Sequence, residues 1–252
     1  MEARHILITG ASSGLGEALA KAYARAGIRL ALGGRNRERL EVVAAGCRAS
    51  GAEVAAGLLD VTDAGAMAAW IEREDRVSPL DLVIANAGTS AGTGSGGEAP
   101  EQVRRIFAVN LDGVVNTVQP AIRCMAARRR GQIAVMSSLA SFRGFPGAPA
   151  YCASKAAVRV YGESLRGALA RHGIAVSVIC PGFVKTPMTA ANKFPMPFLM
   201  EADKAAAFIQ RGLARRKARI AFPWRLYAMS WLLAALPPGI TDRWLATLPE
   251  KS

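Results

Sequence analysis

The sequence contains few of the residues that bind transition metals or form disulfide bridges. Its 252 residues include two histidines and four cysteines. The cysteines are each 28 or more residues apart, at Cys47, Cys124, Cys152 and Cys180, so no C-x-x-C pair and no Cys/His ligand spacing occurs. The sequence therefore predicts neither a metal site nor a disulfide framework.

Acidic residues are also scarce. The 32 Lys and Arg outnumber the 19 Asp and Glu, which gives a net charge of +13. A charge of this sign suits an anionic ligand, an anionic membrane surface or nucleic acid. The basic residues are scattered, and they are not interleaved with aromatic side chains as in a groove for single-stranded nucleic acid. We therefore expect a solvated basic surface and no nucleic-acid partner.

Long hydrophobic segments are missing. The most apolar stretch covers residues 226–236, far short of the ~20 residues that a membrane-spanning helix needs. The N-terminus enters a strand-like run at once and shows no hydrophobic core of a signal peptide. These features lead us to expect a cytoplasmic protein.

Short apolar runs alternate with longer stretches of helical periodicity along the whole chain. Strands are expected at residues 6–9, 30–32, 54–58, 82–85, 133–136, 176–179 and 219–222. Unbroken apolar strands separated by helices are typical of a parallel sheet that is covered on both faces. We predict an α/β protein with one domain over residues 1–252, a Rossmann-type doubly wound parallel sheet of about seven strands with helices on both faces.

Three segments interrupt this alternation. Residues 87–100 form a loop rich in Gly and Ser. Residues 186–203 contain three prolines among Met and Phe and are expected to form a mobile loop near the substrate. Residues 224–252 form an apolar C-terminal tail that contains Trp224, Trp231 and Trp244.

A glycine-rich turn, TGASSGLG, follows the first predicted strand and opens onto a helix. Gly10 allows a tight turn, Gly14 allows the backbone to approach a pyrophosphate, and Gly16 allows close packing of helix and strand. The N–H groups at the start of a helix attract phosphate. The spacing G-x-x-x-G-x-G differs from the usual dinucleotide fingerprint G-x-G-x-x-G.

Two other motifs compete with this interpretation. The same turn matches G-x-S-x-G, with Ser12 as the nucleophile of a hydrolase, and His172 is the histidine that follows it in the chain. His172 stands beside Gly173 at a predicted helix end, so we expect it to interact with the helix dipole rather than to act as the base of a hydrolase. Gly92, Gly94 and Gly97 spell G-x-G-x-x-G, but they lie several residues beyond the end of a predicted strand within the Gly/Ser-rich loop, and we interpret them as loop residues.

An acid–base pair is predicted at the start of a later helix. Tyr151 and Lys155 are four residues apart and therefore share a helix face. A phenol has a pKa near 10, and a nearby ammonium favours its ionised form, so Lys155 would tune Tyr151 as a general acid or base. Ser138 ends the strand run at 133–136, where a hydroxyl can hydrogen-bond a substrate carbonyl oxygen.

Together these residues resemble the short-chain dehydrogenase/reductase family over residues 5–190. The resemblance extends to Asp60-Val61 for the adenine ring, Asn86-Ala87-Gly88 after the fourth strand, and Asn110 in the proton relay. It implies hydride transfer between a nicotinamide and a carbonyl or alcohol. The implied catalytic residues are Asn110, Ser138, Tyr151 and Lys155. The implied cofactor-binding residues are Gly10, Ser12, Ser13, Gly14, Leu15, Gly16, Arg35, Asp60, Val61, Asn86, Ala87, Gly88, Tyr151, Lys155, Pro181, Gly182, Val184 and Thr186.

The end of the second predicted strand bears on the choice of cofactor. An NAD enzyme usually has an acidic residue there that bonds the ribose hydroxyls, whereas this chain has Gly33, Gly34 and Arg35. A guanidinium attracts a 2′-phosphate. We therefore expect NADP(H) to be preferred over NAD(H), although a basic residue near Ser13, found in some NADP enzymes of the family, is absent.

The sequence leaves the substrate and the oligomeric state open. The apolar side chains in 186–203 either line a pocket for an apolar ketone or aldehyde or pack against the body of the protein. The tail is expected in a homodimer or homotetramer interface, with peripheral membrane contact as the alternative. A cofactor-binding sensor or scaffold without turnover is the alternative to an enzyme.

Overall fold

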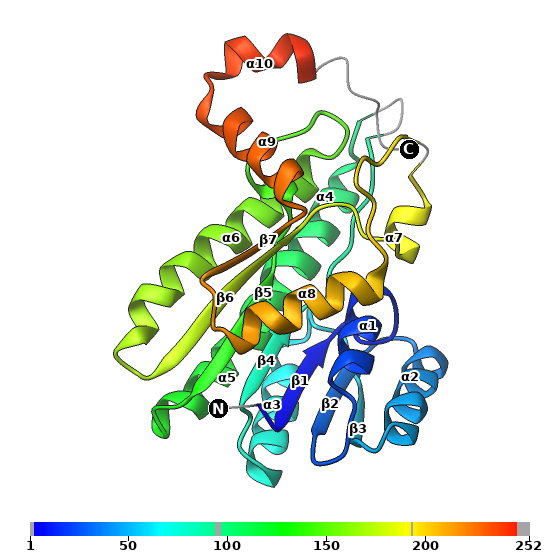
Figure 1. The fold of residues 1–252 in the computed structure, drawn as a ribbon, viewed down its shortest axis with the longest axis vertical. Helices are drawn as coiled ribbons and strands as arrows, with labels where there is room; N and C mark the ends of the chain where they lie inside the picture. The colour runs from blue at the N-terminus through cyan, green and yellow to red at the C-terminus, as the bar shows by residue number, and fades with distance from the viewer. Residues whose placement is uncertain (1–2, 94–96, 193, 246–252) are drawn as a thin grey trace.

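The computed structural model describes residues 3–93, 97–192 and 194–245, apart from the side chains of residues 243 and 244. Within these ranges one sheet of seven parallel strands has the order β3-β2-β1-β4-β5-β6-β7 (Figure 1). Its strands are β1 (His5–Thr9), β2 (Arg29–Gly34), β3 (Glu53–Leu58), β4 (Leu82–Ala85), β5 (Gly131–Met136), β6 (Ile174–Pro181) and β7 (Arg219–Phe222). The predicted doubly wound α/β fold is confirmed.

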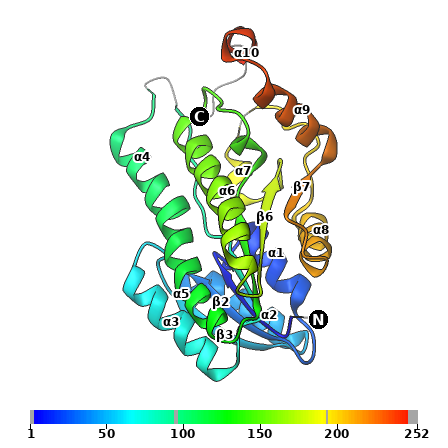
Figure 2. The same cartoon turned by 90° about the vertical axis from the view of Figure 1, so that its left-hand side faces the viewer.

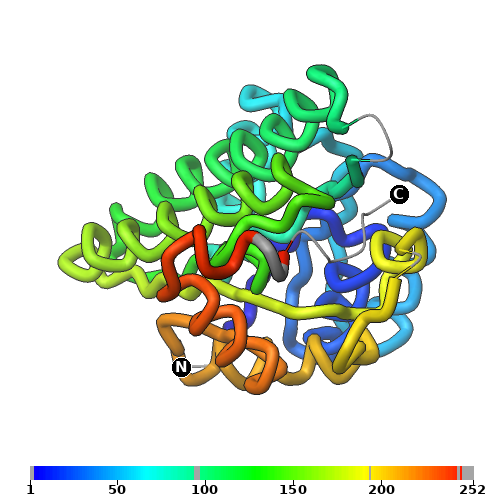
Figure 3. The backbone as a smooth tube through the Cα atoms, turned by 90° about the horizontal axis from the view of Figure 1, so that it is seen from above, coloured from blue at the N-terminus to red at the C-terminus, as the bar shows by residue number. Residues whose placement is uncertain are grey.

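Helices cover both faces of this sheet, as Figures 2 and 3 show. One face carries α1 (Gly14–Tyr23), α2 (Arg37–Ala49) and α8 (Ala202–Ala214). The other carries α3 (Ala64–Val77), α4 (Pro100–Phe107), the π-helix η2 (Ala108–Asp112), α5 (Gly113–Ala127) and α6 (Pro149–Ala170). The remaining helices are the 3-10 helix η3 (Leu139–Ser141), α7 (Pro187–Ala190), α9 (Trp224–Ala235) and α10 (Pro238–Leu245).

The two helical layers create two hydrophobic cores, one on each side of the sheet. Successive residues of β1 show the alternation, because Ile6 and Ile8 belong to the core under α1 and α8 while Leu7 belongs to the core under α3 and α5. Burial on both faces explains why the strands are apolar without interruption. All strands run the same way, so their carboxyl ends meet at one edge of the sheet.

The irregular segments are more ordered than the sequence indicated. Thr186 accepts a hydrogen bond from the Thr189 N–H and so begins α7 inside the expected loop, and Val184 bridges to Met200 at the other end of that loop. The expected tail contains α9 and α10, while its residues 246–252, like Gly94 in the glycine-rich loop, lie outside the described residues. None of the described helices is both long and apolar enough to cross a membrane.

Packing of α6 on the sheet predicts opposite effects for two glycines of that helix. A Cβ at Gly162 would lie 2.6 Å from Val135 Cγ2 and 2.8 Å from Val178 Cγ2, whereas a Cβ at Gly167 meets nothing within 4 Å. We expect Gly162→Ala to lower the free energy of unfolding by about 1–3 kcal/mol and Gly167→Ala to raise it by about 0.5–1 kcal/mol. Urea denaturation measures both, and equal effects would contradict the packing.

Candidate active site

The glycine-rich turn lies at the carboxyl end of β1 and leads into α1. Gly10 and Gly14 have φ values of 65° and 59°, a region that favours glycine. A Cβ on Gly16 would lie 2.1 Å from the Gly10 carbonyl oxygen, so Gly16 permits the close contact of helix and turn. Ser13 is the N-cap residue of α1 in an extended conformation, and its side chain does not cap the helix. The turn thus presents a helix N-terminus of the kind that binds phosphate.

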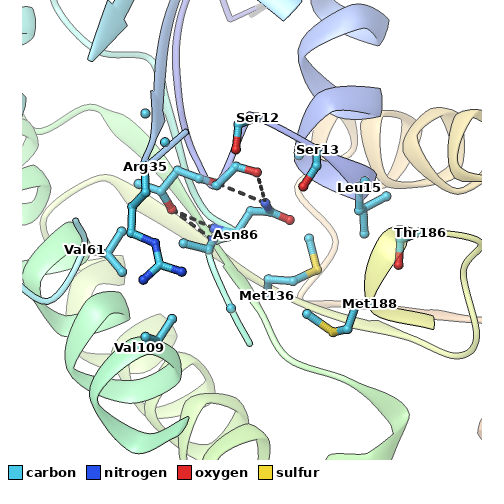
Figure 4. A pocket seen from close by; sticks show the side chains of 18 of the residues that line it. Ser12, Ser13, Leu15, Arg35, Val61, Asn86, Val109, Met136, Thr186 and Met188 are labelled. Atoms are coloured by element: carbon cyan, nitrogen blue, oxygen red, sulfur yellow. Dashed lines mark hydrogen bonds between the residues drawn. The ribbon is translucent and has the colours of Figure 1, made fainter. Parts of the chain in front are cut away.

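A cavity of about 400 Å³ opens along the carboxyl ends of strands β1 to β6 (Figure 4). Each predicted cofactor-binding residue lines it, from Gly10 and Ser12–Gly16 through Arg35, Asp60, Val61 and Asn86–Gly88 to Tyr151, Lys155, Pro181, Gly182, Val184 and Thr186. Ser138 lines it as well. Residues from six segments of the chain are therefore brought together at the edge of the sheet where parallel α/β proteins bind ligands.

Asn86 joins β4 to the glycine-rich turn. Its Nδ2 donates to the carbonyl oxygens of Thr9, at 2.9 Å, and Gly10, at 3.3 Å. Thr9 Oγ1 in turn accepts hydrogen bonds from the backbone N–H groups of Asn86 and Ala87, both at 3.1 Å. Figure 4 shows Asn86 in the middle of the cavity wall. These bonds fix the turn against the neighbouring strand and keep the cavity open between them.

Lys155 is a buried cation in the wall of the cavity. It stands in the second turn of α6, its residue is 3% exposed, and its Nζ donates to the Met136 carbonyl oxygen at 2.9 Å. Burial penalises the charged form and lowers the pKa of Lys155 to about 8. A buried ammonium of this kind is a strong site for an oxygen-rich ligand, because hydrogen bonds to its charged form would recover part of the lost solvation.

Tyr151 lies one turn before Lys155, whose Nζ is 5.9 Å from the centroid of the phenol ring. Burial raises the pKa of Tyr151, and a hydrogen bond with the Ser138 side chain opposes that rise without cancelling it. The expectation that Lys155 lowers this pKa is therefore wrong for the polypeptide by itself. Desolvation is the larger effect, and the ammonium is directed at the Met136 carbonyl. The phenol accordingly holds its proton and is ready to donate it.

Asn110 occupies a position behind the cavity rather than in its wall. It is fully buried in the π-helix η2, where its amide group bonds the backbone of Thr89 in both directions. Its Nδ2 also donates to Ser154 Oγ at 3.0 Å. A Cβ on Gly88 would lie 3.3 Å from both Asn110 Oδ1 and Lys155 Nζ. The structure therefore places the Asn110 amide and the Lys155 ammonium next to each other beside the Cα of Gly88.

The far end of the cavity contains a partly exposed ion pair. Arg35 follows β2 and its Nη1 is 3.5 Å from Asp60 Oδ2, with both side chains 40% exposed or more. Burial alone would raise the pKa of Asp60, but hydrogen bonds from Thr62 and the charge of Arg35 lower it. Arg39, on the first turns of α2, lines the same end, whereas Arg37 does not. Two guanidinium groups thus border this part of the cavity.

Trp70 lines the cavity and was not predicted from the sequence. Its indole is 2% exposed and lies where a Cβ on Gly33 or Gly57 would be, with contacts of 2.8 and 2.9 Å. Gly33 and Gly57 are paired across β2 and β3. Two glycines at paired positions of neighbouring strands indicate a space that a large side chain can fill. The sequence alone does not show which residues are paired, so this signal could not be read from it. Met136, Val109 and Met188 add further apolar lining (Figure 4).

The hydrolase alternative fails on geometry. Ser12 follows the carboxyl end of β1, whereas His172 precedes the amino end of β6, and parallel strands put these ends at opposite edges of the sheet. The His172 ring instead accepts a hydrogen bond from Arg171 Nε at 3.3 Å. A Ser–His pair therefore does not form.

Comparison with known proteins shows the family of this chain. The family model described as short chain dehydrogenase matches residues 4–195. The chain belongs to the short-chain dehydrogenase/reductase family. An uncharacterized oxidoreductase of Myxococcus xanthus is 41% identical over 243 residues, which cover 96% of both chains. Dehydrogenase/reductase SDR family member 7B of Bos taurus is 30% identical over 98% of this chain and 81% of its own.

A solved structure extends this similarity to the fold. The short-chain dehydrogenase from Sphingobium yanoikuyae in complex with NADPH aligns with a TM-score of 0.82 and 26% identity, over 98% of this chain and 97% of the other. The protein is thus an enzyme of the short-chain dehydrogenase/reductase family, and the reaction class is oxidoreduction.

Because the Lys155 ammonium is buried, we predict that its removal changes the free energy of unfolding by an amount that depends on pH. A lysine with a folded-state pKa of about 8, below the ordinary 10.5, loses its proton more easily when folded. It therefore lowers the free energy of unfolding below pH 8, and this loss shrinks as the pH rises toward 10.5. We expect Lys155→Met to raise the free energy of unfolding at pH 7 by about 1–3 kcal/mol, with a smaller gain at pH 10.

Urea denaturation at the two pH values measures this change. Lys21→Met is the matched control, because Lys21 is exposed, pairs with Glu17 and has a raised pKa. A gain for Lys155→Met that is as large at pH 10 as at pH 7 would show that the ammonium is not strained by burial.

Proposed function

We propose that the protein reduces an apolar ketone or aldehyde with NADP(H). The observation that carries this proposal is the meeting of Ser138, Tyr151 and Lys155 with the glycine-rich turn in one cavity. The turn supplies a phosphate site and the three side chains supply an acid–base site, which is the combination that hydride transfer to a carbonyl requires.

The residues present fit a dinucleotide. Gly10 and Gly16 allow the turn to pack against Ala87 and the helix to pack against the turn, so that the N-terminus of α1 faces the cavity. The buried Lys155 ammonium suits ribose hydroxyls at the opposite end of the cavity. When bound, the nicotinamide supplies the hydride. The residues that would hold the cofactor are those of the glycine-rich turn, Asp60-Val61, Asn86–Gly88 and Pro181–Thr186.

Each polar residue of the site has a task in this reaction. Tyr151 holds its proton because burial raises its pKa, and it donates that proton to the carbonyl oxygen as the alcohol forms. Ser138, which hydrogen-bonds Tyr151, orients the carbonyl and stabilises the charge that develops on its oxygen. Asn110 stands beside Gly88 and Lys155, and its amide ties η2 to Thr89, so we assign it to the proton relay that returns a proton to Tyr151 through water.

Several features support NADP(H) over NAD(H). The loop after β2 contributes Arg35 and Arg39 to the cavity, and a guanidinium binds a phosphate through two hydrogen bonds. The similar Sphingobium yanoikuyae dehydrogenase is in complex with NADPH. Asp60 is bound by Thr62 as well as by Arg35, so Arg35 is able to exchange its exposed carboxylate partner for a phosphate.

The substrate would enter beside the segment 186–203. Met188 lines the cavity and is 38% exposed, and Phe198 and Leu199 of the same segment are exposed on the surface. An apolar entrance favours an apolar ketone or aldehyde. We further propose that this segment moves when substrate binds, and that the enzyme acts in the cytoplasm as a homodimer or homotetramer.

A direct test compares the wild type with Tyr151→Phe. Oxidation of NADPH by a panel of apolar ketones and aldehydes is followed by loss of the 340 nm absorbance of the reduced nicotinamide. We expect Tyr151→Phe to lower kcat by about 10²-fold or more, because the proton donor is removed. Binding of NADPH by both proteins without turnover in either would favour the sensor or scaffold alternative.

Cofactor preference is tested by reversing one charge. We expect Arg35→Asp to raise KM for NADPH at least tenfold and to leave KM for NADH nearly unchanged, because only the 2′-phosphate is repelled. Arg37→Asp is the matched control, since Arg37 is exposed but does not line the cavity. A wild type that prefers NADH would refute the NADP(H) assignment.

A further inference from the structure

Helix α6, which carries Tyr151, is not capped by its own N-cap residue. That residue is Ala148, which makes no side-chain hydrogen bond, and Pro149 at the first helical position has no N–H to donate. Tyr151 follows two residues later and therefore lies in the first turn. Because the N–H groups of a first turn have no partners within the helix, contacts from other segments decide how firmly this part of α6 is held.

The next turn of α6 is held by the end of β5. The Lys155 carbonyl oxygen accepts a hydrogen bond from Ser137 Oγ at 2.8 Å, and Lys155 Nζ donates to the Met136 carbonyl oxygen at 2.9 Å. The first turn has a weaker connection to this strand. The Ser138 side chain bonds the Tyr151 phenol, which does not fix the backbone. The backbone before Tyr151 is held from another direction.

A carboxylate from the loop after β4 binds the first turn of α6. Glu98 Oε2 accepts a hydrogen bond from the N–H of Ala150, the residue directly before Tyr151, at 2.8 Å. The other oxygen, Oε1, is buried and has no hydrogen-bond partner among the described residues. The positive end of the α6 dipole stabilises a negative charge at this place. Glu98 thus supplies from outside the helix the acceptor that Ala148 lacks.

Glu98 is positioned by α4, which begins two residues later at Pro100. Helix α4 packs against α6 (Figure 2). Gln102 Nε2 of α4 donates to the Gly92 carbonyl oxygen at 2.8 Å, so the same helix also holds an earlier part of the loop after β4. The Glu98 carboxylate therefore stands beside a helix whose place relative to α6 is set by packing.

We propose that Glu98 is a positioning residue for Tyr151. Its carboxylate holds the backbone directly before the phenol, so that Tyr151 keeps its place beside Ser138. Glu98 is not among the described residues that line the cavity, and it therefore acts through Tyr151 rather than on the substrate. A displacement of about 1 Å in a reacting group can lower a rate by about 10²-fold. The effect on the rate rests on the proposed function, whereas the effect on α6 does not.

Amide hydrogen exchange of the full chain tests the anchor without any assay of activity. We expect Glu98→Ala to speed exchange of the Ala150 and Tyr151 N–H groups about tenfold or more and to lower the melting temperature by about 2–4 °C. Glu98→Gln keeps an acceptor oxygen and should exchange more slowly than Glu98→Ala. Glu101→Ala is the matched control, because Glu101 is an exposed carboxylate on α4 that pairs with Arg104. Unchanged exchange in Glu98→Ala would overturn the proposal.

A double-mutant cycle tests whether Glu98 acts through Tyr151. At a temperature where each variant is folded, we expect Glu98→Ala to lower kcat about tenfold and to leave the Kd for NADPH nearly unchanged. In the Tyr151→Phe background the same substitution should cause no further loss of kcat, because the group that Glu98 positions is gone. Additive losses, or a wild-type kcat in Glu98→Ala, would overturn the proposal. A wild type that reduces no carbonyl compound would instead refute the proposed function, and hydrogen exchange would still decide whether Glu98 anchors α6.

Discussion

Burial of the Lys155 ammonium is the constraint around which the site is built. The side chain is held in the wall of the cavity by the Met136 carbonyl, and its pKa is lowered to about 8 because little solvent reaches it. Ser137 Oγ fixes the backbone of the same residue by donating to the Lys155 carbonyl oxygen at 2.8 Å. Strand β5 therefore positions α6 at this point through two hydrogen bonds, and the placement of Tyr151 one turn earlier follows from helix geometry.

The parallel sheet converts distant parts of the chain into one site. Residues after β1, β2, β3, β4, β5 and β6 meet because the carboxyl ends of parallel strands share an edge. The loop after β4 is tied to η2, which carries Asn110, and to α6, which carries Tyr151 and Lys155. Thr89 is bound by Asn110 of η2, and Glu98 accepts a hydrogen bond from the Ala150 N–H at the start of α6, at 2.8 Å. Asn110 and the start of α6, which carries Tyr151, are thereby fixed relative to each other.

The sequence predicted those features whose geometry depends on residues close together in the chain, and it missed those that depend on contacts between distant segments. The turn from Thr9 to Gly16 and the pair Tyr151–Lys155 are short motifs whose geometry follows from neighbouring residues, and the structure places both in the cavity. Trp70 was missed because its site is made by Gly33 and Gly57, which meet through strand pairing. The direction of the Tyr151 pKa was missed because it depends on burial, and the five-residue motif from Tyr151 to Lys155 does not indicate how deeply the phenol is buried.

The central claim is that burial destabilises the charged form of Lys155 and that an oxygen-rich ligand stabilises it. Proton uptake on cofactor binding tests this claim. Calorimetric titration with NADPH at pH 8, in buffers of different ionisation enthalpy, counts the protons taken up. With a pKa of about 8, we expect uptake of roughly half a proton per site, and the same uptake in Tyr151→Phe. Binding without proton uptake, or with proton release, would contradict this account of the site.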